Sequence, residues 1–528
     1  MVKGGVAVAP HAAAARSAAA VMREGGDALE AMVAAAATIA VVYPHMNGIG
    51  GDSFWLVHEP GKPPRAIDAC GAAGERVDAA FYRGLGLGTI PVRGPLAANT
   101  VAGTIGGWAL ALGHSREAWG GRLPLDRLLA DAIGYAEQGI TVTRSQEAST
   151  AAKQGELAGQ PGFAGRFMPG RRVPRQGEPF AQRPMAGTLR RLAEAGLEDF
   201  YRGELARTIA TELQAAGSPL TLADLAGYRA EWREPLRLDH ARGRLFNMTP
   251  PTQGVVSLMI LGILERLGAA EPESADFVHG VVEATKQAFR VRDRHVTDPR
   301  YMEVDPQSLL ADAALARMAS AIDPARAAPW GARTAAGDTV WMGAIDAAGR
   351  AVSFIQSIYH EFGSGIVLPA TGINWQNRGC SFSLEPGARN PLVPGRKPFH
   401  TLNPALALLD DGRTMVYGTM GGDGQPQTQA AVFMRHVAYG MSLQDAVAAP
   451  RWLLGRTWGS MSESLKLEGR FDRGLIDELR RRGHDVEVVG DFDEVVGHAG
   501  ALVRHRDGAL DGGFDPRSDG AVVTAQGD

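Results

Sequence analysis

Cysteine is scarce in this chain, with only Cys70 and Cys380 among 528 residues. Two thiols cannot build the disulfide framework of a small secreted domain, and they are compatible with a reducing cytosol. The longest apolar run, residues 31–43, is shorter than the roughly 20 residues that a membrane-spanning helix needs. The first residues also lack the ordered charged region, apolar region and cleavage site of a secretory signal. These absences predict a cytoplasmic protein with no membrane partner.

Charge of one sign is not concentrated anywhere in the chain. It carries 54 Lys and Arg against 58 Asp and Glu, a formal net charge of −4. The most basic stretch, Arg166 to Arg183, is rich in proline and glycine and predicts a solvated loop. A chain without a basic face is a poor match for nucleic acid or for an anionic membrane. We therefore expect a small-molecule partner and no nucleic-acid partner.

The chain is long and has many apolar residues. With 528 residues, 45% of them hydrophobic, it is large enough for a layered core that encloses a site. Alternating β-prone runs joined by turns predict hairpins at residues 339–358 and 405–418, and a strand at 53–57. Helical spacing of apolar residues predicts helical regions at 11–25, 27–42, 123–154, 188–228, 277–296, 426–439 and 443–449, with breaks at Gly139, Gly196 and Gly203. This mixture of elements favours a layered α/β sandwich.

A loop of small residues, AAPWGARTAAGD at 327–338, precedes the first predicted hairpin. Its composition predicts that it is dispensable for packing. The hairpin itself begins at Thr339. Considered alone, Thr339 is an ordinary β-prone residue at the start of a strand.

The stretch from Gly337 to Ser353 resembles the start of the small subunit of γ-glutamyltranspeptidases. In that family the threonine at this position becomes N-terminal when the precursor cuts itself. The resemblance implies cleavage between Asp338 and Thr339, and it makes Thr339 the catalytic nucleophile. A free N-terminal threonine needs no separate base, because its own α-amino group, with a pKa of about 7.7–8.0, takes the hydroxyl proton.

Further motifs extend this resemblance over almost the whole chain. They are Gly48–Asp52 (Gly-Ile-Gly-Gly-Asp, where the family has Gly-Ile-Gly-Gly-Gly), Phe200–Gly203, Leu220–Tyr228, Pro250–Gly254, Phe362–Val367 and Asp515–Ser518. The resemblance implies a four-layer αββα sandwich of the N-terminal nucleophile hydrolase type, with additional helices from the large subunit. It also implies a large subunit of residues 1–338 and a small subunit of residues 339–528 in one folded unit. Such a heterodimer of cleaved chains, alone or paired as a dimer, is the expected mature form.

Three further residues acquire roles from the same resemblance. Gly421 and Gly422 align with paired glycines whose N–H groups form the family's oxyanion hole; a tight turn before a helix is the alternative interpretation. Ser357 stands where the family has a second threonine that hydrogen-bonds the nucleophile and assists self-cleavage. A strand serine without that role is the alternative for Ser357.

The predicted substrate site departs from that of γ-glutamyl enzymes. Cys70 replaces the arginine that grips the α-carboxylate, and we expect it to be a buried structural thiol. By alignment, Tyr359 and Ser381 replace an asparagine and an aspartate that hold the α-amino group, and Arg378 replaces a glutamine. Losing a carboxylate and gaining an arginine disfavours an ammonium group and favours an anionic one.

Residues 375–382 resemble the Gln-Asn-Arg-Gly variant of a divergent branch that includes oxamate amidohydrolase and γ-glutamyltranspeptidase-like proteins. We expect Arg378 to anchor a substrate carboxylate. His400 and Thr401 replace paired serines and still offer donors. The favoured function is hydrolysis of a small carboxylate-bearing amide, such as oxamate to oxalate and ammonia. The predicted substrate-binding residues are Arg378, His400, Thr401, Tyr359, Asn377 and Ser381.

Three alternative functions stay open at this point. They are γ-glutamyl hydrolysis or transfer on glutathione-like compounds, removal of a β-lactam side chain, and a non-catalytic family member. No metal is expected, because His484 and His498 lack ligand spacing and are predicted to be surface or core histidines. No cofactor is expected, because the sequence contains no cofactor motif.

Overall fold

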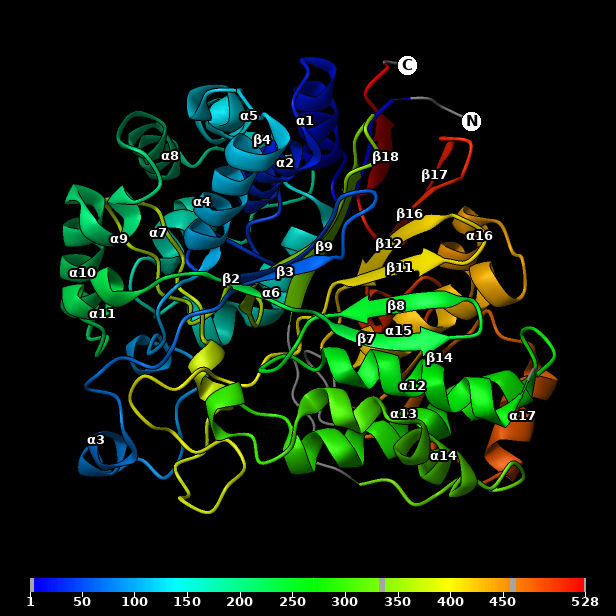
Figure 1. Ribbon diagram of the computed structural model, residues 1–528. Coiled ribbons are helices and arrows are strands. Elements are labelled where there is room, and N and C mark those ends of the chain that lie inside the picture. Colours follow the sequence, from blue (N-terminus) through cyan, green and yellow to red (C-terminus); the bar gives the residue numbers. More distant parts are fainter. Residues whose placement is uncertain (1–3, 269, 332–337, 456–461, 527–528) are drawn as a thin grey trace.

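The computed structural model describes residues 4–268, 270–331, 338–455 and 462–526. Two antiparallel sheets form its centre (Figure 1). Their strands are β1 (Val6–Ala9), β2 (Asp52–His58), β3 (Arg65–Ala69), β6 (Glu231–Arg233), β7 (Leu236–His240), β8 (Gly243–Asn247), β9 (Asp338–Ile345), β10 (Ala351–Tyr359), β11 (Ala405–Leu409), β12 (Thr414–Thr419), β16 (Ala499–Arg504), β17 (Leu510–Phe514) and β18 (Ala521–Thr524). One sheet has seven strands in the order β18-β1-β9-β10-β2-β3-β6. The other has six, in the order β17-β16-β12-β11-β8-β7.

Helices cover the outer face of each sheet, so that the molecule has four main layers (Figure 1). Those packed on the seven-stranded sheet include α1 (Ala12–Arg23), α2 (Ala28–Val42) and α4 (Thr104–His114), and α5 (Leu125–Gln138) packs on α2. Those packed on the six-stranded sheet include α12 (Gly254–Leu267), α15 (Gly424–Phe433) and α16 (Leu443–Ala448), and α13 (Ala275–His295) packs on α12 and α15. The predicted αββα sandwich is confirmed.

Residue alternation along the strands explains why both faces of each sheet are buried. In β9, Trp341 and Ile345 belong to the apolar cluster between the sheets, whereas Met342 belongs to the cluster under α1 and α2. In β12, Val416 faces the other sheet and Met415 faces the helices. Successive side chains of a strand point to opposite faces, so strands with two buried faces must be apolar almost throughout.

A tryptophan sets how closely the two sheets approach. The Trp341 ring lies over Gly418 of β12 and Gly500 of β16, and its Nε1 donates to Ser353 Oγ at 3.0 Å. A Cβ placed on Gly418 would lie 2.2 Å from Trp341 Cδ1. Glycine is therefore required opposite the Trp341 indole. Trp341 itself lies two residues after Thr339 in β9.

Further helices extend the molecule beyond the sandwich, most of them at the left of Figure 1 or along its lower edge. They are α3 (Ala79–Gly84), α6 (Arg144–Leu157), α7 (Phe163–Phe167), α8 (Arg183–Ala195), α9 (Asp199–Arg202), α10 (Glu204–Ala216), α11 (Leu222–Gly227), α14 (Asp312–Ser320) and α17 (Arg473–Arg481). Small sheets are formed by β4 (Ile140–Thr141) with β5 (Pro179–Phe180), and by β13 (Trp452–Leu454), β14 (Leu465–Glu468) and β15 (Val486–Val489).

Both hairpins and the helical regions predicted from the sequence are present. The break predicted at Gly139 is present: Gly139 adopts φ +95° and ends α5, and the short strand β4, which the sequence did not predict, follows before α6 begins. The loop at 327–338 differs from the prediction, because Ala328 is held by two buried side chains. Residues 332–337 of that loop lie outside the described residues.

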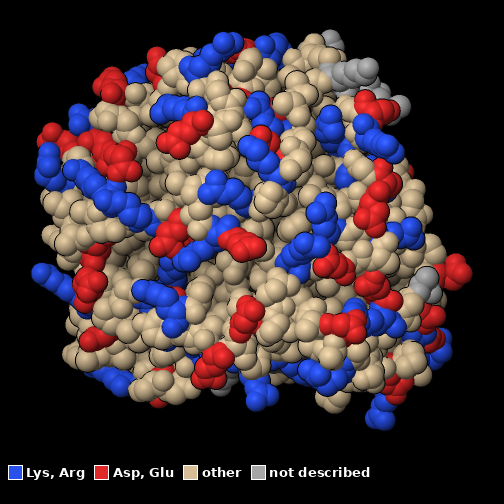
Figure 2. All heavy atoms as spheres, viewed as in Figure 1, with Lys and Arg blue, Asp and Glu red and all other residues tan. Residues whose placement is uncertain are grey.

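The surface agrees with the charge distribution in the sequence. On the face shown in Figure 2, basic and acidic side chains are interspersed. Within the described residues, none of the helices combines the length and apolar character needed to cross a membrane. The long apolar run at residues 31–43 is instead buried, almost all of it within α2.

Candidate active site

Thr339 is the second residue of β9, in the middle of the seven-stranded sheet. Its neighbours pair with β10, Val340 with Gln356 and Asp338 with Tyr359, so one strand has an extra residue between these pairs. The Thr339 side chain is buried, and its Oγ1 has no hydrogen-bond partner among the described residues. A buried hydroxyl without a partner is uncommon and marks a position where a reacting group can bind.

The irregularity in β10 turns the strand away from the sheet beside Thr339. Tyr359 adopts φ +80°, and its N–H donates to Ser357 Oγ at 2.8 Å. Asn377 braces the turn from the other side: its Oδ1 accepts from His360 N at 3.1 Å and its Nδ2 donates to Val92 O at 2.8 Å. Bulges and positive φ values of this kind re-aim side chains next to functional sites. Asn377 thus positions the backbone with both of its side-chain polar atoms.

Arg378 opens a short 3-10 helix, Arg378–Ser381, and is only 2% exposed. Its guanidinium carbon lies 3.4 Å from the centroid of the Tyr359 ring. Its Nε and Nη2 have no hydrogen-bond partner among the described residues. A buried cation normally requires an anion and full hydrogen bonding. The stacked guanidinium, with two nitrogens that have no protein partner, can therefore hold an anion and forms the candidate anion site.

His400 and Thr401 lie on the loop that leads into β11. His400 N donates to Pro251 O at 2.9 Å, and Gln253 Nε2 donates to Thr401 O at 3.0 Å. Both imidazole nitrogens and Thr401 Oγ1 lack hydrogen-bond partners among the described residues. Burial, together with the charges of Arg378 and then Lys397, holds the pKa of His400 well below its usual value. A neutral His400 and the Thr401 hydroxyl are thus available to a ligand near Arg378.

Asp52 lies beside His400 at the start of β2. Its Oδ2 is 3.4 Å from His400 Nε2, and its Oδ1 accepts from the N–H groups of Gly71 and Gly103, each at 3.0 Å. Asp52 is also the residue across the sheet from Ser357. Burial is the main cause that raises the pKa of Asp52 to about 8. The buried pair therefore links the strand beside Thr339 to the anion site.

Gly421 and Gly422 follow β12 and precede α15, with φ values of +116° and +53°. These left-handed conformations favour glycine. Gln253 Nε2 donates to Gly422 O at 2.9 Å, and Arg292 Nη1 donates to Gln253 Oε1 at 2.9 Å and to Asp423 Oδ1 at 2.6 Å. The N–H groups of the two glycines have no acceptor among the described residues. The turn is pinned through its carbonyl side, which leaves two donors for a ligand.

Burial raises the pKa of Tyr359 above its usual value, and the charges of Arg378 and Asp423 both act on this residue. Asp423 directly follows the two glycines, so the glycine turn lies within electrostatic range of the Tyr359 ring that Arg378 stacks on. Ser381 is less closely associated: it is half-buried, and its Oγ is 3.5 Å from Phe399 O. Cys70 is buried and donates to Asp68 Oδ1 at 3.1 Å, as expected of a structural thiol.

A family model described as Gamma-glutamyltranspeptidase matches residues 14–525. The chain belongs to the γ-glutamyltranspeptidase family. It is 59% identical over 519 residues to an oxamate amidohydrolase proenzyme of Klebsiella pneumoniae, covering 98% of each chain. It is 40% identical to the glutathione hydrolase-like YwrD proenzyme of Bacillus subtilis, covering 98% of this chain and 97% of the relative. A crystal structure of cephalosporin acylase from Bacillus halodurans has a TM-score of 0.90 at 34% identity, covering 99% of this chain and 96% of that chain.

Membership of the γ-glutamyltranspeptidase family confirms the predicted enzyme class, a self-processing amidohydrolase. A solved γ-glutamyltranspeptidase chain from Pseudomonas nitroreducens covers 60% of this chain and 94% of its own length, with a TM-score of 0.53 at 30% identity. That share is close to the length of the predicted large subunit. A mature heterodimer of two chains from one precursor, acting on a small amide, is therefore supported.

Three residues of this γ-glutamyltranspeptidase-family site were not given a role from the sequence: Asp52, Gln253 and Arg292. Asp52 ends a Gly-Ile-Gly-Gly-Asp motif where the family motif has glycine, and that substitution was the available signal. Gln253 lies in a recognised motif but acts through its side-chain hydrogen bonds. Arg292 is in the middle of α13, where no local pattern separates it from other helix arginines.

Proposed function

We propose that this protein hydrolyses oxamate, or a closely similar small amide with an adjacent carboxylate and no ammonium group. The observation that carries the proposal is Arg378, a buried guanidinium with two nitrogens unpaired and stacked on Tyr359. Planar carboxylates match the arginine fork, and His400 and Thr401 add neutral donors. The 59% identity to an oxamate amidohydrolase proenzyme supports the same substrate class.

Maturation begins with cleavage between Asp338 and Thr339. Thr339 Oγ attacks the carbonyl carbon of Asp338, the peptide C–N bond breaks, and the nitrogen takes the hydroxyl proton. Water then hydrolyses the resulting ester, giving the carboxylate of Asp338 and the free α-amino group of Thr339. Residues 1–338 and 339–528 become the two chains of the mature enzyme.

The two chains would remain associated because they share both sheets. In the seven-stranded sheet, β9 and β10 of the small subunit lie between β1 and β2 of the large subunit. In the six-stranded sheet, β11 of the small subunit pairs with β8 of the large subunit. The strand β18 of the small subunit also pairs with β1, so separation would expose backbone groups along four strand pairs, which is costly. We propose a heterodimer of these chains, and pairing of two heterodimers as its larger assembly.

In the catalytic step, Thr339 Oγ attacks the amide carbon of oxamate while the α-amino group takes the hydroxyl proton. The N–H groups of Gly421 and Gly422 stabilise the oxyanion. The C–N bond then breaks, the nitrogen receives a proton, and ammonia leaves an oxalyl ester on Thr339. Water cleaves that ester to oxalate and restores the hydroxyl. Ser357, on the neighbouring strand beside Thr339, supplies the hydroxyl that we propose assists self-cleavage.

The test compares ammonia release from oxamate with glutamate release from γ-glutamyl-p-nitroanilide. We expect a higher kcat/KM for oxamate, because Cys70 and Ser381 supply neither the arginine nor the carboxylate that an α-amino acid needs. Intact-mass measurement should find a new N-terminus at Thr339. A preference for the γ-glutamyl compound would refute the proposed substrate, and a chain that stays whole would refute the self-processing mechanism.

A further inference from the structure

Gln253 joins the two loops that carry the proposed substrate contacts. Its side chain is buried, and its Nε2 donates to two backbone carbonyl oxygens, to Thr401 O at 3.0 Å and to Gly422 O at 2.9 Å. Because both distances are measured from one nitrogen, the two carbonyl oxygens lie no more than about 6 Å apart. The loop beside the anion site and the turn of the oxyanion site are therefore held close together.

Arg292 fixes which end of the Gln253 amide faces the two carbonyl groups. Its Nη1 donates to Gln253 Oε1 at 2.9 Å and to Asp423 Oδ1 at 2.6 Å. An arginine has only donors, so the amide oxygen must face Arg292 and the amide nitrogen must face Thr401 and Gly422. The Arg292 and Asp423 side chains are 2% and 0% exposed. A buried ion pair thus sets the orientation of the bridge.

Backbone hydrogen bonds reinforce the same junction. His400 N donates to Pro251 O at 2.9 Å, and Gln253 N donates to His400 O at 3.0 Å. Thr252 and His400 also form an isolated parallel β-bridge. In the proposed mature enzyme, residues 250–254 belong to the large subunit, whereas the two loops that Gln253 joins belong to the small subunit. A side chain of the large subunit therefore holds two loops of the small subunit at one spacing.

The spacing of the loops matters because oxamate is short. Its carboxylate carbon is bonded directly to its amide carbon, so the two carbons are about 1.5 Å apart. The molecule has no methylene group with which to adjust this length. With its carboxylate at Arg378, oxamate can direct its amide oxygen to the N–H groups of Gly421 and Gly422 only if the two loops keep one separation.

We propose that Gln253 is a positioning residue that sets the separation between the anion site and the oxyanion turn, and thereby restricts the enzyme to amides whose carboxylate is bonded directly to the amide carbon. The inference rests on the proposed hydrolysis of oxamate, and it gives Gln253 no contact with the substrate. Without the Gln253 amide, Thr401 O would lose its one hydrogen-bond donor among the described residues, and the link from this loop to Gly422 would be lost with it.

The experiment compares oxamate, malonamate and succinamate, which have no, one and two methylene groups between the carboxylate and the amide. Ammonia release gives kcat and KM for each amide, expressed per cleaved enzyme as counted by intact mass. We expect the wild type to prefer oxamate. Gln253→Met removes the amide at nearly constant volume. It should lower kcat/KM for oxamate by about 100-fold, the cost of a misplacement of about 1 Å, and kcat/KM for succinamate by less than about threefold, because a flexible link can follow a shifted loop.

The loss on oxamate should fall on kcat more than on KM. Arg378 would still bind the carboxylate, whereas the amide oxygen would miss the glycine N–H groups. Gln253→Glu separates the bridge from the contact with Arg292, because its carboxylate still accepts from Arg292 but donates to neither carbonyl group. This variant should lose the preference for oxamate as Gln253→Met does. Recovery of the wild-type preference in Gln253→Glu would overturn the inference.

Gln182→Met is the matched control for the glutamine. Gln182 is buried, its Oε1 accepts from Arg166 Nη2, and its Nε2 donates to Val41 O at 2.7 Å. Like Gln253, it connects an arginine to a backbone carbonyl group, but it does so against α2. Its loss should lower the thermal midpoint and leave the preference among the three amides unchanged.

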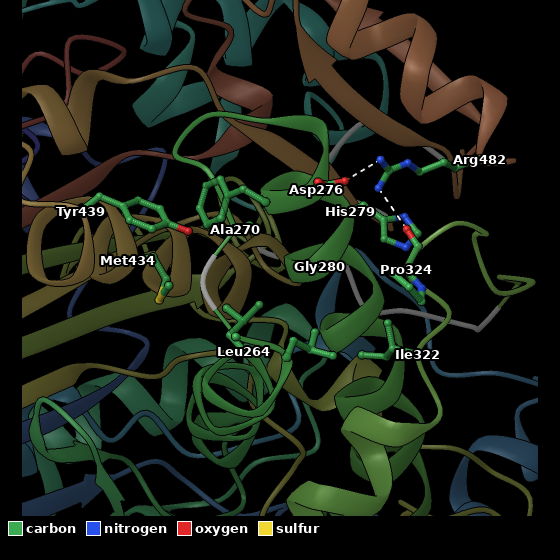
Figure 3. Close-up of a pocket in the computed structure, with 13 residues that line it drawn as sticks. Leu264, Ala270, Asp276, His279, Gly280, Ile322, Pro324, Met434, Tyr439 and Arg482 are labelled. Carbon is green, nitrogen blue, oxygen red and sulfur yellow. Dashed lines mark hydrogen bonds and ion pairs between the residues drawn. The ribbon is translucent and has the colours of Figure 1, made fainter.

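A control for the arginine lies at the opposite end of α13. Arg292 and Asp276 are sixteen residues apart on this helix, about 24 Å along its axis. Figure 3 shows Asp276 with Arg482 and Pro324 at one side of a cavity of about 360 Å³. Arg482 donates there to Asp276 Oδ1 and to Pro324 O. Arg482→Met should leave the substrate preference unchanged, whereas Arg292→Met should reduce it.

Two further results would overturn the inference. One is a Gln253→Met enzyme that keeps the wild-type ratio of kcat/KM between oxamate and succinamate. The other is an equal loss of kcat/KM on all three amides, which is the result expected if Gln253 only stabilises the fold. A wild-type enzyme that prefers succinamate, or that hydrolyses none of the three amides, would instead refute the proposed hydrolysis of oxamate, and the inference would fail with it.

Discussion

Replacing Arg378 by alanine tests the anion site most directly. In the free enzyme its Nε and Nη2 have no partner among the described residues, so the substitution removes no protein hydrogen bond from those atoms. What it removes is the charge that a substrate carboxylate would meet, together with the stack on Tyr359 at 3.4 Å. The loss should therefore appear in kcat/KM for carboxylate substrates much more than in folding.

The expected size follows from burial. Removing one partner of a buried charge pair costs about 2–5 kcal/mol. His400 and Thr401 would still offer donors to the carboxylate, so we expect the lower half of that range, about 2–3 kcal/mol. At 1.36 kcal/mol per factor of ten, kcat/KM for oxamate should fall by about 30-fold to 150-fold. Arg378→Lys should recover only part of this, because an ammonium lacks the planar fork.

Arg396→Ala is the matched control for this measurement. Arg396 is similarly buried, at 4% exposure, and its guanidinium carbon lies 4.1 Å from the centroid of the Tyr301 ring. Its Nη2, unlike that of Arg378, has a protein partner and donates to Thr297 Oγ1 at 2.8 Å. Its loss should lower the thermal midpoint and leave kcat/KM within about threefold. The assay is initial-rate ammonia release with oxamate, alongside γ-glutamyl-p-nitroanilide.

The reasoning would be refuted by a particular pattern. If Arg378→Ala lowered the thermal midpoint as Arg396→Ala does, while kcat/KM for oxamate changed by less than about threefold, Arg378 would be a packing residue on Tyr359. If the variant lost activity equally on both substrates, the guanidinium would act on a step common to all amides. Neither result is compatible with a carboxylate anchor.

Two other changes test the nucleophile and the oxyanion site. Thr339→Ala should remain one uncut and inactive chain, because no Oγ exists to attack the preceding carbonyl; intact-mass spectrometry decides this, and a cut at any other bond would contradict it. Gly422→Val should lower kcat by about 100-fold to 1,000-fold with a smaller rise in KM, because a side chain at φ +53° disturbs an oxyanion donor. Steady-state kinetics and a thermal melting curve check this. A change in KM alone would show that Gly422 has a purely structural role.

Much of the fold was predictable because its signals are local. The first two helices are separated at Gly25, which adopts φ +91°, and α2 begins with a capping box between Asp27 and Glu30. The hairpins were marked by alternating apolar residues around short polar turns. The order of strands in the sheets was not available from such signals. It depends on β9 inserting between β1 and β10, a pairing across more than 300 residues.

The candidate site was predictable as far as motifs extend. Thr339, Arg378 and the glycine pair lie in recognisable stretches, whereas the function of Asn377 depends on contacts with His360 and Val92 that no motif specifies. The loop before Thr339 was misjudged for a related reason. A run of small residues gives no sequence signal of tertiary contacts, because such a segment is held through its backbone N–H and C=O groups by side chains that are distant in the sequence.

The pair of Asp52 and His400 leads to a prediction about pH. Burial raises the pKa of Asp52 to about 8 and keeps His400 neutral, so at neutral pH the proton of Asp52 faces His400 Nε2. His400 must then carry its own proton on Nδ1, which can donate to a carboxylate. Arg378 and Lys397 are the other charged groups that act on this imidazole, and both favour its neutral form.

Above about pH 8 Asp52 loses its proton. The neutral imidazole then carries its single proton on Nε2, where it donates to the Asp52 carboxylate. Nδ1 becomes an acceptor and repels the substrate, so kcat/KM for oxamate should fall on the alkaline side. The rise on the acid side comes from the α-amino group of Thr339, whose ordinary pKa is about 7.7–8.0. Asp52→Asn should abolish the alkaline fall, because its Oδ1 still faces the N–H groups of Gly71 and Gly103 and its amide always donates to Nε2. Profiles of kcat/KM from pH 6 to 10 test this; an alkaline limb that is the same in both enzymes would show that the pair does not control the donor.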